Sequence, residues 1–158
     1  MKKHVTIKYS NKGLRFWEAG CTWIENGDAT IQLRTCFKAK ERYLGLISKK
    51  ELLAHEMVHA MRAHLNEPRF EEVLAYQTSS LAFRRYFGPF FRTPRESLLF
   101  MVALLVTPFF WPLPTLLVGV GLLRLVRTQR TYAKARKNRG FEELLSMTDK
   151  EIEAASQE

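Results

Sequence analysis

The chain has 158 residues, enough for one domain of ordinary size, and its formal net charge at pH 7 is +9. Hydrophobic residues make up 46% and aromatic residues 12% of it, a composition that excludes an intrinsically disordered chain. It contains two cysteines, too few for a small disulfide-stabilised scaffold. Because no apolar signal segment follows Met1, we expect a cytosolic N-terminal region in which Cys21 and Cys36 are reduced.

The first part of the chain shows the patterns of β-strands. Apolar and polar residues alternate at the start, and the expected strands span 5–9, 15–24 and 29–37. Asn26 and Gly27 lie between the last two strands, and this pair is typical of a type I′ hairpin turn. That register places Cys21 opposite Gln32 and far from Cys36 along the hairpin, so we expect no disulfide bond.

Two helices should follow the strands. Ser48 and Glu51 have the spacing of a capping box, which predicts a helix over about 49–65. Pro68 can open a second helix, which we expect over about 69–87.

The first of these helices carries the sequence His55-Glu56-Met57-Val58-His59, an HExxH pattern. Residues four apart lie on the same helix face, so both imidazoles can bind one zinc ion. Glu56 can then take a proton from a zinc-bound water, whose pKa the metal lowers toward about 7. A hydrolytic site needs a third protein ligand, and the histidine of the longer HExxHxxGxxH pattern is absent, because Leu65 stands in its place.

A glutamate from the second helix is the other kind of third ligand. Glu72 is followed three residues later by Ala75, and with this spacing the chain resembles the gluzincin metallopeptidases over about 30–83, especially the small minigluzincin-like domains. The resemblance implies that His55, His59 and Glu72 bind Zn2+, that Glu56 is the general base, and that the substrate is a peptide or protein.

Several details of this resemblance stay open. Glu71 is the alternative third ligand, and Tyr76 stands where many family members have Asp or Asn, so the hydrogen-bond partners of the histidines are unassigned. In the family, the strand before the zinc helix is a sheet edge that pairs with the substrate; by position this is 29–37. Tyr43, Tyr76 and His64 are the candidates for stabilising the oxyanion.

The same residues allow a second interpretation, a non-enzymatic membrane-anchored binding module that retains a zincin-like fold. A purely structural zinc site is not expected, because such sites close with four protein ligands and rely on cysteine. Neither cysteine is near the motif in sequence.

Residues 97–123 form a run of 27 without a charge, longer than the roughly 18 that indicate membrane insertion. Pro108, Pro112 and Pro114 lie in its middle and leave two possibilities, a hairpin of two short helices or one kinked transmembrane helix. Basic residues flank both ends, which favours the hairpin, because both flanks would then face the cytosol. Two buried helices of a soluble domain are a third possibility, although a small domain could hardly bury so long a run.

A basic segment and an acidic tail follow this run. Residues 124–139 contain seven basic and no acidic residues, which favours contact with anionic lipid through Arg124, Arg127 and Arg130. Nucleic-acid binding is not expected, because Tyr132 is the only aromatic residue of the segment and no reader motif is present. We expect 140–158 to be a solvated tail with one or two short helices; the alternative is a tail that packs loosely or binds a partner through Phe141, Leu144, Leu145 and Ile152.

Together these patterns predict an α+β fold, with a small antiparallel or mixed sheet packed on a zinc-binding helix pair, followed by a hydrophobic helical hairpin or span. The expected division is a metallopeptidase-like domain at 1–95, a membrane-inserting hairpin or transmembrane helix at 96–126, and a basic juxtamembrane segment with an acidic helical tail at 127–158. The expected location is the membrane, with the catalytic domain facing the cytosol.

Overall fold

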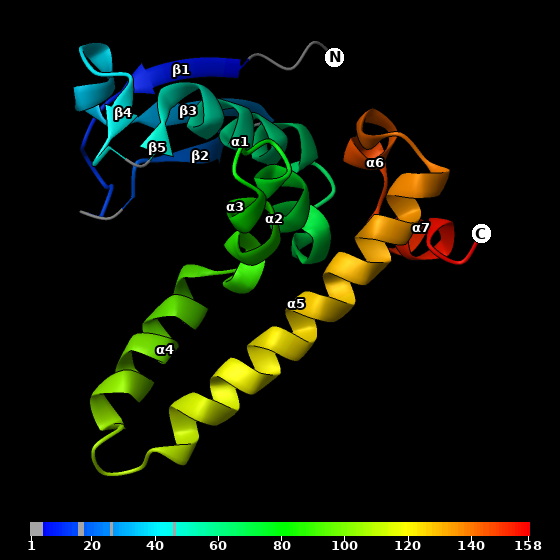
Figure 1. Ribbon diagram of the computed structural model, residues 1–158. Coiled ribbons are helices and arrows are strands. Elements are labelled where there is room, and N and C mark those ends of the chain that lie inside the picture. The colour runs from blue at the N-terminus through cyan, green and yellow to red at the C-terminus, as the bar shows by residue number, and fades with distance from the viewer. Residues whose placement is uncertain (1–4, 16–17, 26, 46) are drawn as a thin grey trace.

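A computed structural model describes residues 5–15, 18–25, 27–45 and 47–158. A small sheet lies against a pair of helices, a long helical hairpin extends away from them, and the last helices return to the pair (Figure 1). This arrangement confirms the predicted α+β class.

The sheet has three strands, β1 (Val5–Tyr9), β2 (Gly20–Glu25) and β3 (Asp28–Leu33), in the order β1-β3-β2. β2 runs antiparallel to β3 and Cys21 lies opposite Gln32, as predicted. β1 runs parallel to β3, so the sheet is mixed. Gly27 has a φ of 88°, as a type I′ turn requires, whereas the other predicted turn residue, Asn26, lies outside the described residues.

One consequence of this strand order corrects the sequence analysis. The strand predicted at 29–37 to be an edge is the central strand β3, because β1 occupies its second side. It ends at Leu33 and is followed by a short 3-10 helix, η1 (Thr35–Lys38). The edge strand on the side of the helix pair is therefore β2.

The HExxH helix begins where its capping residue predicts. Two short strands, β4 (Arg42–Tyr43) and β5 (Ile47–Ser48), lead into α1 (Lys49–Arg62), and the Ser48 hydroxyl accepts a hydrogen bond from the Glu51 backbone N–H at 3.1 Å. The Glu51 carboxylate does not complete the box. It accepts hydrogen bonds from the Ser80 backbone and hydroxyl and pairs with Arg84, so it ties α1 to a later segment.

The helix predicted over 69–87 is two helices, α2 (Pro68–Tyr76) and α3 (Ala82–Phe87), with the 3-10 helix η2 (Gly88–Phe90) after them. Polar side chains at the break compete for backbone groups: the Thr78 hydroxyl donates to the Ala75 carbonyl, and the Ser79 hydroxyl accepts from the Leu81 N–H. The break allows α2 and α3 to take different directions.

α1 is held between two hydrophobic clusters. On one side it packs on the sheet, in a cluster whose fully buried members are Ala19, Ile31, Leu33 and Phe37. On the other side it packs with α2 and the C-terminal helices, in a cluster that includes Val58, Phe70, Val73, Leu74, Tyr132, Ala135, Leu144 and Ile152. The HExxH helix is therefore fixed by contacts from both ends of the chain.

The last 18 residues are not a solvated tail, as the sequence analysis expected. They form α6 (Phe141–Ser146) and α7 (Asp149–Ala155), and the side chains of Leu144 and Ile152 are 0% exposed. α6 packs against α1 and α5, α7 packs against α5, and buried residues of both helices belong to one cluster with residues of α1 and α2. The acidic residues of this segment indicated exposure to solvent. A few apolar side chains on each helix nevertheless suffice to pack it into the core.

The apolar run forms a helical hairpin, with α4 (Pro94–Val106) antiparallel to the first half of α5 (Pro112–Asn138) (Figure 1). An ion pair between Glu96 and Arg124, at 2.6 Å, joins the two arms at their base. Gly121 allows the Phe90 ring to lie against α5, where a Cβ atom would be 2.7 Å away from it. The tip carries strongly exposed apolar side chains, with Phe109 90% exposed.

Among the described helices, none combines the length and the apolar character needed to cross a membrane. α4 has 13 residues, about 20 Å at 1.5 Å per residue, and α5 carries charges from Arg124 onward. This finding contradicts the predicted transmembrane helix and the predicted membrane location with a domain facing the cytosol. Arg124, one of the residues expected to contact lipid, is instead engaged in the ion pair with Glu96.

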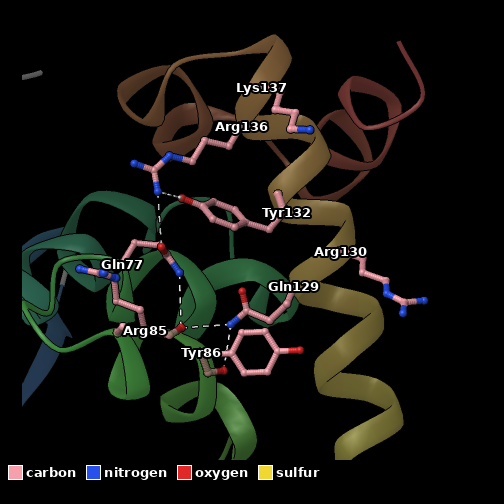
Figure 2. A pocket seen from close by; sticks show the side chains of 10 residues that line it. Gln77, Arg85, Tyr86, Gln129, Arg130, Tyr132, Arg136 and Lys137 are labelled. Carbon is pink, nitrogen blue, oxygen red and sulfur yellow. Dashed lines mark hydrogen bonds between the residues drawn. The ribbon is translucent and has the colours of Figure 1, made fainter.

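The second half of α5 returns to the helix pair. The Gln129 amide donates to the carbonyl oxygens of Arg85 and Tyr86 at 3.0 Å each, and Arg136 donates to the Tyr132 hydroxyl at 3.3 Å (Figure 2). A cavity of about 640 Å³ lies beside these bonds. The Gln129 bonds fasten α5 to α3, whereas the Arg136–Tyr132 bond lies within α5.

Candidate metal centre

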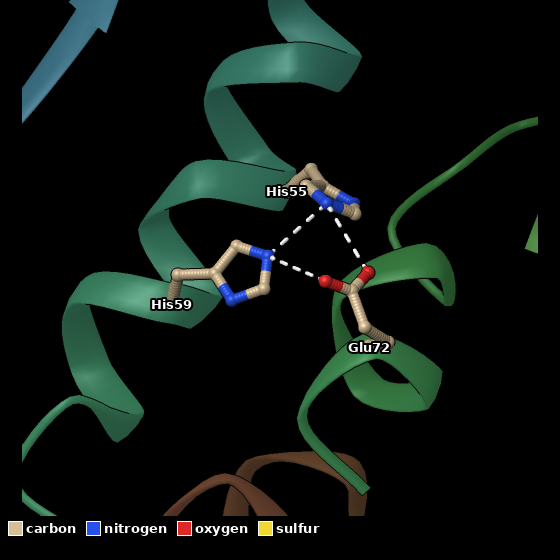
Figure 3. A group of neighbouring side chains, drawn as sticks. All are labelled: His55, His59 and Glu72. Atoms are coloured by element: carbon tan, nitrogen blue, oxygen red, sulfur yellow. Dashed lines mark hydrogen bonds and ion pairs between the residues drawn. The ribbon is translucent and has the colours of Figure 1, made fainter. Parts of the chain in front are cut away.

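His55 and His59 of α1 and Glu72 of α2 converge on one point (Figure 3). The two Nε2 atoms of the histidines are 3.2 Å apart. The Glu72 carboxylate oxygens lie 3.8 Å from Nε2 of His55 and 3.6 Å from Nε2 of His59. Three potential ligand atoms from two helices thus surround a common position.

These distances suit a tetrahedral zinc ion. Ligand atoms about 2.0–2.2 Å from such an ion are roughly 3.3–3.6 Å from one another. The two imidazole nitrogens are 3.2 Å apart, and each lies 3.6 to 3.8 Å from a different oxygen of Glu72, which is close to this range. Two imidazole nitrogens and one carboxylate also form a donor set typical of catalytic zinc sites, which leave a fourth position open.

Local sequence explains how the ligands meet. The four-residue spacing of His55 and His59 puts them one turn apart on α1. On α2, Phe70 and Leu74 are fully buried in the core, and this burial turns the intervening Glu72 toward α1. The predicted ligand set is therefore brought together, although the chain between the two helices contains no metal-binding motif of its own.

Glu71, the alternative third ligand, has a different place. Its Oε1 lies 2.6 Å from Nδ1 of His59, so the imidazole N–H donates to this carboxylate. The bond leaves Nε2 of His59 directed at Glu72 and the shared position. Glu71 is thus the hydrogen-bond partner of His59 that the sequence analysis could not assign.

His55 is held in another way. It has a hydrogen bond at the Ala75 backbone, and its ring lies edge-on to the Tyr76 ring with the centroids 4.7 Å apart. Tyr76 is in turn packed against Gly88, where any side chain would collide with the ring. Tyr76 therefore fixes the first histidine by packing, at the position where the gluzincin pattern has Asp or Asn.

The electrostatics of the group depend on burial. Burial, assisted by the neighbouring His59 and Arg84, lowers the pKa of His55 to about 3, so this imidazole is neutral and free to bind a cation. Burial raises the pKa of Glu72 to about 7. Burial by itself would lower the pKa of His59, but the hydrogen bond to Glu71 and the charges of Glu72 and Glu56 outweigh it and raise the pKa.

Glu56 lies beside the cluster and is 6% exposed. The Thr22 hydroxyl, on the edge strand β2, donates to Oε2 of Glu56 at 2.8 Å. Burial raises the pKa of Glu56 despite this bond. No local signal in the sequence indicated Thr22; only the packing of α1 on the sheet brings residues 34 positions apart into contact.

A cavity of about 560 Å³ opens on the cluster between β2, α1 and α2. Such a volume is typical of ligand-binding sites. Its described lining includes four glutamates and no lysine or arginine, although the chain as a whole carries a charge of +9; the glutamates are Glu18, Glu56, Glu71 and Glu72. The thiol of Cys21 also lines it, with a pKa that burial and the nearby Glu56 raise to about 11.

The three oxyanion candidates have different surroundings. His64 is bonded to the Met61 carbonyl at an exposed position, and Tyr43 packs near Phe37 in the core beneath the sheet. Tyr76 alone of the three contacts a residue of the cluster. A second cavity of about 170 Å³ is lined by His55, Glu56 and Tyr76, and also by Arg84, which the sequence analysis did not single out.

The site thus combines two imidazoles, the Glu72 carboxylate close to both of them, the buried Glu56 and an open cavity. This arrangement can hold a divalent transition metal and place a general base next to it. No protein-family model, curated protein or solved structure matches the chain, so its site is described by its own geometry.

Proposed function

We propose that this protein is a zinc-dependent metallopeptidase of the gluzincin type, in which His55, His59 and Glu72 bind Zn2+ and Glu56 is the general base. The observation that carries the proposal is the convergence of three ligand atoms at tetrahedral spacing next to a buried glutamate. A closed structural site would need a fourth protein ligand, whereas this cluster faces a cavity.

The residues around the cluster have separate tasks in this reaction. Bound zinc lowers the pKa of a water and polarises the carbonyl of the peptide bond. The Glu56 carboxylate accepts the proton of the attacking water and later delivers it to the leaving amine, while Thr22 holds Oε2 in place. Burial keeps the pKa of Tyr76 above its ordinary value, so its hydroxyl stays protonated and can donate to the developing oxyanion.

The free edge of β2 suits an extended peptide. Among the described strands, β2 pairs with β3 alone, so its other side offers unpaired backbone groups beside the cluster. A peptide added there would run along the cavity, since Gly20, Cys21 and Thr22 line it. The carboxylates of the lining favour substrates with basic side chains near the scissile bond.

The test compares the wild-type protein with Glu56→Gln in a metal analysis and in an assay with fluorescence-quenched peptides. We expect about one zinc per chain in both proteins and a loss of hydrolysis of about 10²-fold or more in the variant. Glu41→Gln, at an exposed position away from the cavity, is the matched control and should keep full activity.

Three outcomes would contradict parts of this proposal. Wild-type protein without stoichiometric zinc would remove its basis. Hydrolysis that survives Glu56→Gln would exclude the assigned base. Stoichiometric zinc without hydrolysis of any peptide in a diverse library would favour a non-enzymatic binding module that uses the same fold.

A further inference from the structure

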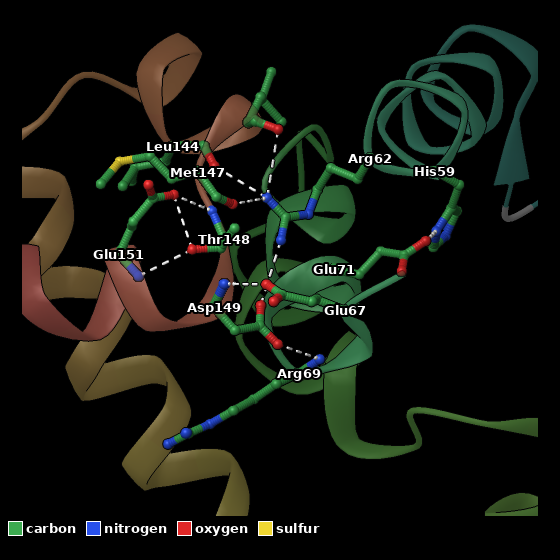
Figure 4. A network of polar contacts seen from close by, with 11 residues as sticks. His59, Arg62, Glu67, Arg69, Glu71, Leu144, Met147, Thr148, Asp149 and Glu151 are labelled. Atoms are coloured by element: carbon green, nitrogen blue, oxygen red, sulfur yellow. Dashed lines mark hydrogen bonds and ion pairs between the residues drawn. The ribbon is translucent and has the colours of Figure 1, made fainter. Parts of the chain in front are cut away.

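The C-terminal segment, defined as α6, α7 and the residues between them, reaches the metal centre through Arg62 (Figure 4). Arg62 lies three residues after His59 on α1, and it is 1% exposed. Its Nη1 donates to the carbonyl oxygens of Leu144 at 3.1 Å and of Met147 at 2.8 Å. A buried guanidinium therefore joins the end of α6 to the HExxH helix.

Asp149, the first residue of α7, connects this guanidinium to α2. Its Oδ1 lies 3.4 Å from Nη2 of Arg62, and its Oδ2 accepts a hydrogen bond of 3.1 Å from the backbone N–H of Arg69. Its own N–H donates to the carboxylate of Glu67, which precedes α2. One carboxylate thus contacts the last turn of α1 and the first turn of α2.

On both helices, the residue that contacts Asp149 lies close in sequence to a proposed metal ligand. Arg62 is one turn beyond His59, and Arg69 is three residues before Glu72. A carboxylate at a helix N-terminus accepts backbone N–H groups and is favoured by the helix dipole, so it fixes where α2 begins. Metal ligands must be held within tenths of an ångström, and the separation of α1 and α2 decides the distance from Glu72 to the histidines.

We propose that the C-terminal segment is a clamp for the metal centre, in which Asp149 is a positioning residue that holds the ligand helix α2 at its working distance from α1. The proposal rests on the proposed zinc site. It assigns to the C-terminal segment a role in metal affinity.

The test measures Zn2+ affinity of the full-length protein by competition with a chromophoric chelator, and the absorption spectrum of the Co2+-substituted protein. Asp149→Ala should weaken Zn2+ binding about 10- to 100-fold and alter the Co2+ spectrum. Asp149→Asn can still accept from the Arg69 N–H but loses the ion pair with Arg62, so it should weaken Zn2+ binding only about twofold to tenfold. Glu153→Gln is the matched control: it removes an ion pair between the same helix and the Arg69 side chain at the surface, and should change the affinity less than twofold.

Each result has one meaning. If wild-type protein binds no zinc, the proposed function fails, and the clamp fails with it. If wild-type binds zinc and folded Asp149→Ala binds it equally well, the clamp alone is overturned. If Asp149→Ala does not fold, Asp149→Asn decides: a weakening of twofold to tenfold with a changed Co2+ spectrum supports the clamp, and wild-type affinity with an unchanged spectrum overturns it.

Discussion

Replacement of Arg62 by methionine tests whether the end of the chain belongs to the core. The substitution removes the buried guanidinium but keeps an unbranched side chain of similar length. It leaves the carbonyl oxygens of Leu144 and Met147 without their donor and leaves Asp149 without its charged partner. The perturbation therefore acts where α1, α6 and α7 meet.

The magnitude follows from the individual contacts. The bonds to Leu144 at 3.1 Å and Met147 at 2.8 Å have good lengths, and a hydrogen bond from a charged donor contributes about 1.5–3 kcal/mol. The contacts with Leu145 and Asp149 are longer, at 3.4 Å, and each is weaker than these two bonds, but Asp149 also balances the charge of the buried guanidinium. Removal of one partner of a buried charge pair costs about 3–5 kcal/mol, and because methionine refills part of the space we expect about 3–4 kcal/mol.

The assay is urea-induced unfolding followed by far-ultraviolet circular dichroism, with a chelator present so that metal binding does not add to the stability. Glu153→Gln should lower the free energy of unfolding by less than about 1 kcal/mol, because its ion pair with Arg69 is exposed. If Arg62→Met also lowered it by less than about 1 kcal/mol, the reasoning from the buried network would be wrong.

Two further predictions concern the cluster itself. Thr22→Val should lower kcat for peptide hydrolysis about tenfold without changing the zinc content, because the Glu56 carboxylate loses its 2.8 Å hydrogen bond. Steady-state kinetics at equal zinc loading would measure this decrease, and an unchanged kcat would refute the prediction. Zinc affinity should fall as the pH drops below about 7, since burial raises the pKa of Glu72 to about 7 and a proton then competes with the metal. The same raised pKa stabilises the metal-free protein below pH 4.5, and this contribution is lost as the pH rises through about 7. Chelator competition would measure the trend in zinc affinity and unfolding would measure the trend in stability. Flat profiles across this range would contradict both predictions.

Much of the local structure could be predicted because it depends on neighbours in the chain. Ser48 starts α1 because a hydroxyl there satisfies a free N–H of the first turn. The β2–β3 register follows from a tight turn that leaves one way to pair the strands. The HExxH spacing puts two histidines on one face of any helix, so the proposed metal ligands on α1 could be named from the sequence alone.

The predictions that failed concerned the membrane segment and the edge strand, which depend on how segments pack and not on local sequence alone. The run of 27 uncharged residues indicated membrane insertion, and its prolines predicted the hairpin turn that the structure has, but α4 has only 13 residues and no described helix is long and apolar enough to cross a membrane. The strand predicted at 29–37 was assigned to a sheet edge by the resemblance to the gluzincins, since its own pattern does not say how many partners it has. β1 pairs with it from a distant part of the sequence.

The sequence by itself determined the paired histidines of α1, their helix and the glutamate beside them, because all of these follow from residue type and the period of a helix. The tertiary structure alone decided that Thr22 holds Glu56, that Glu71 holds His59 and that Asp149 joins α1 to α2. These are contacts between segments up to 87 residues apart, and one of them involves a charged side chain, Arg62, that is almost fully buried. Hydrophobic periodicity shows which face of a helix is buried; which partner it meets there depends on how the whole chain packs.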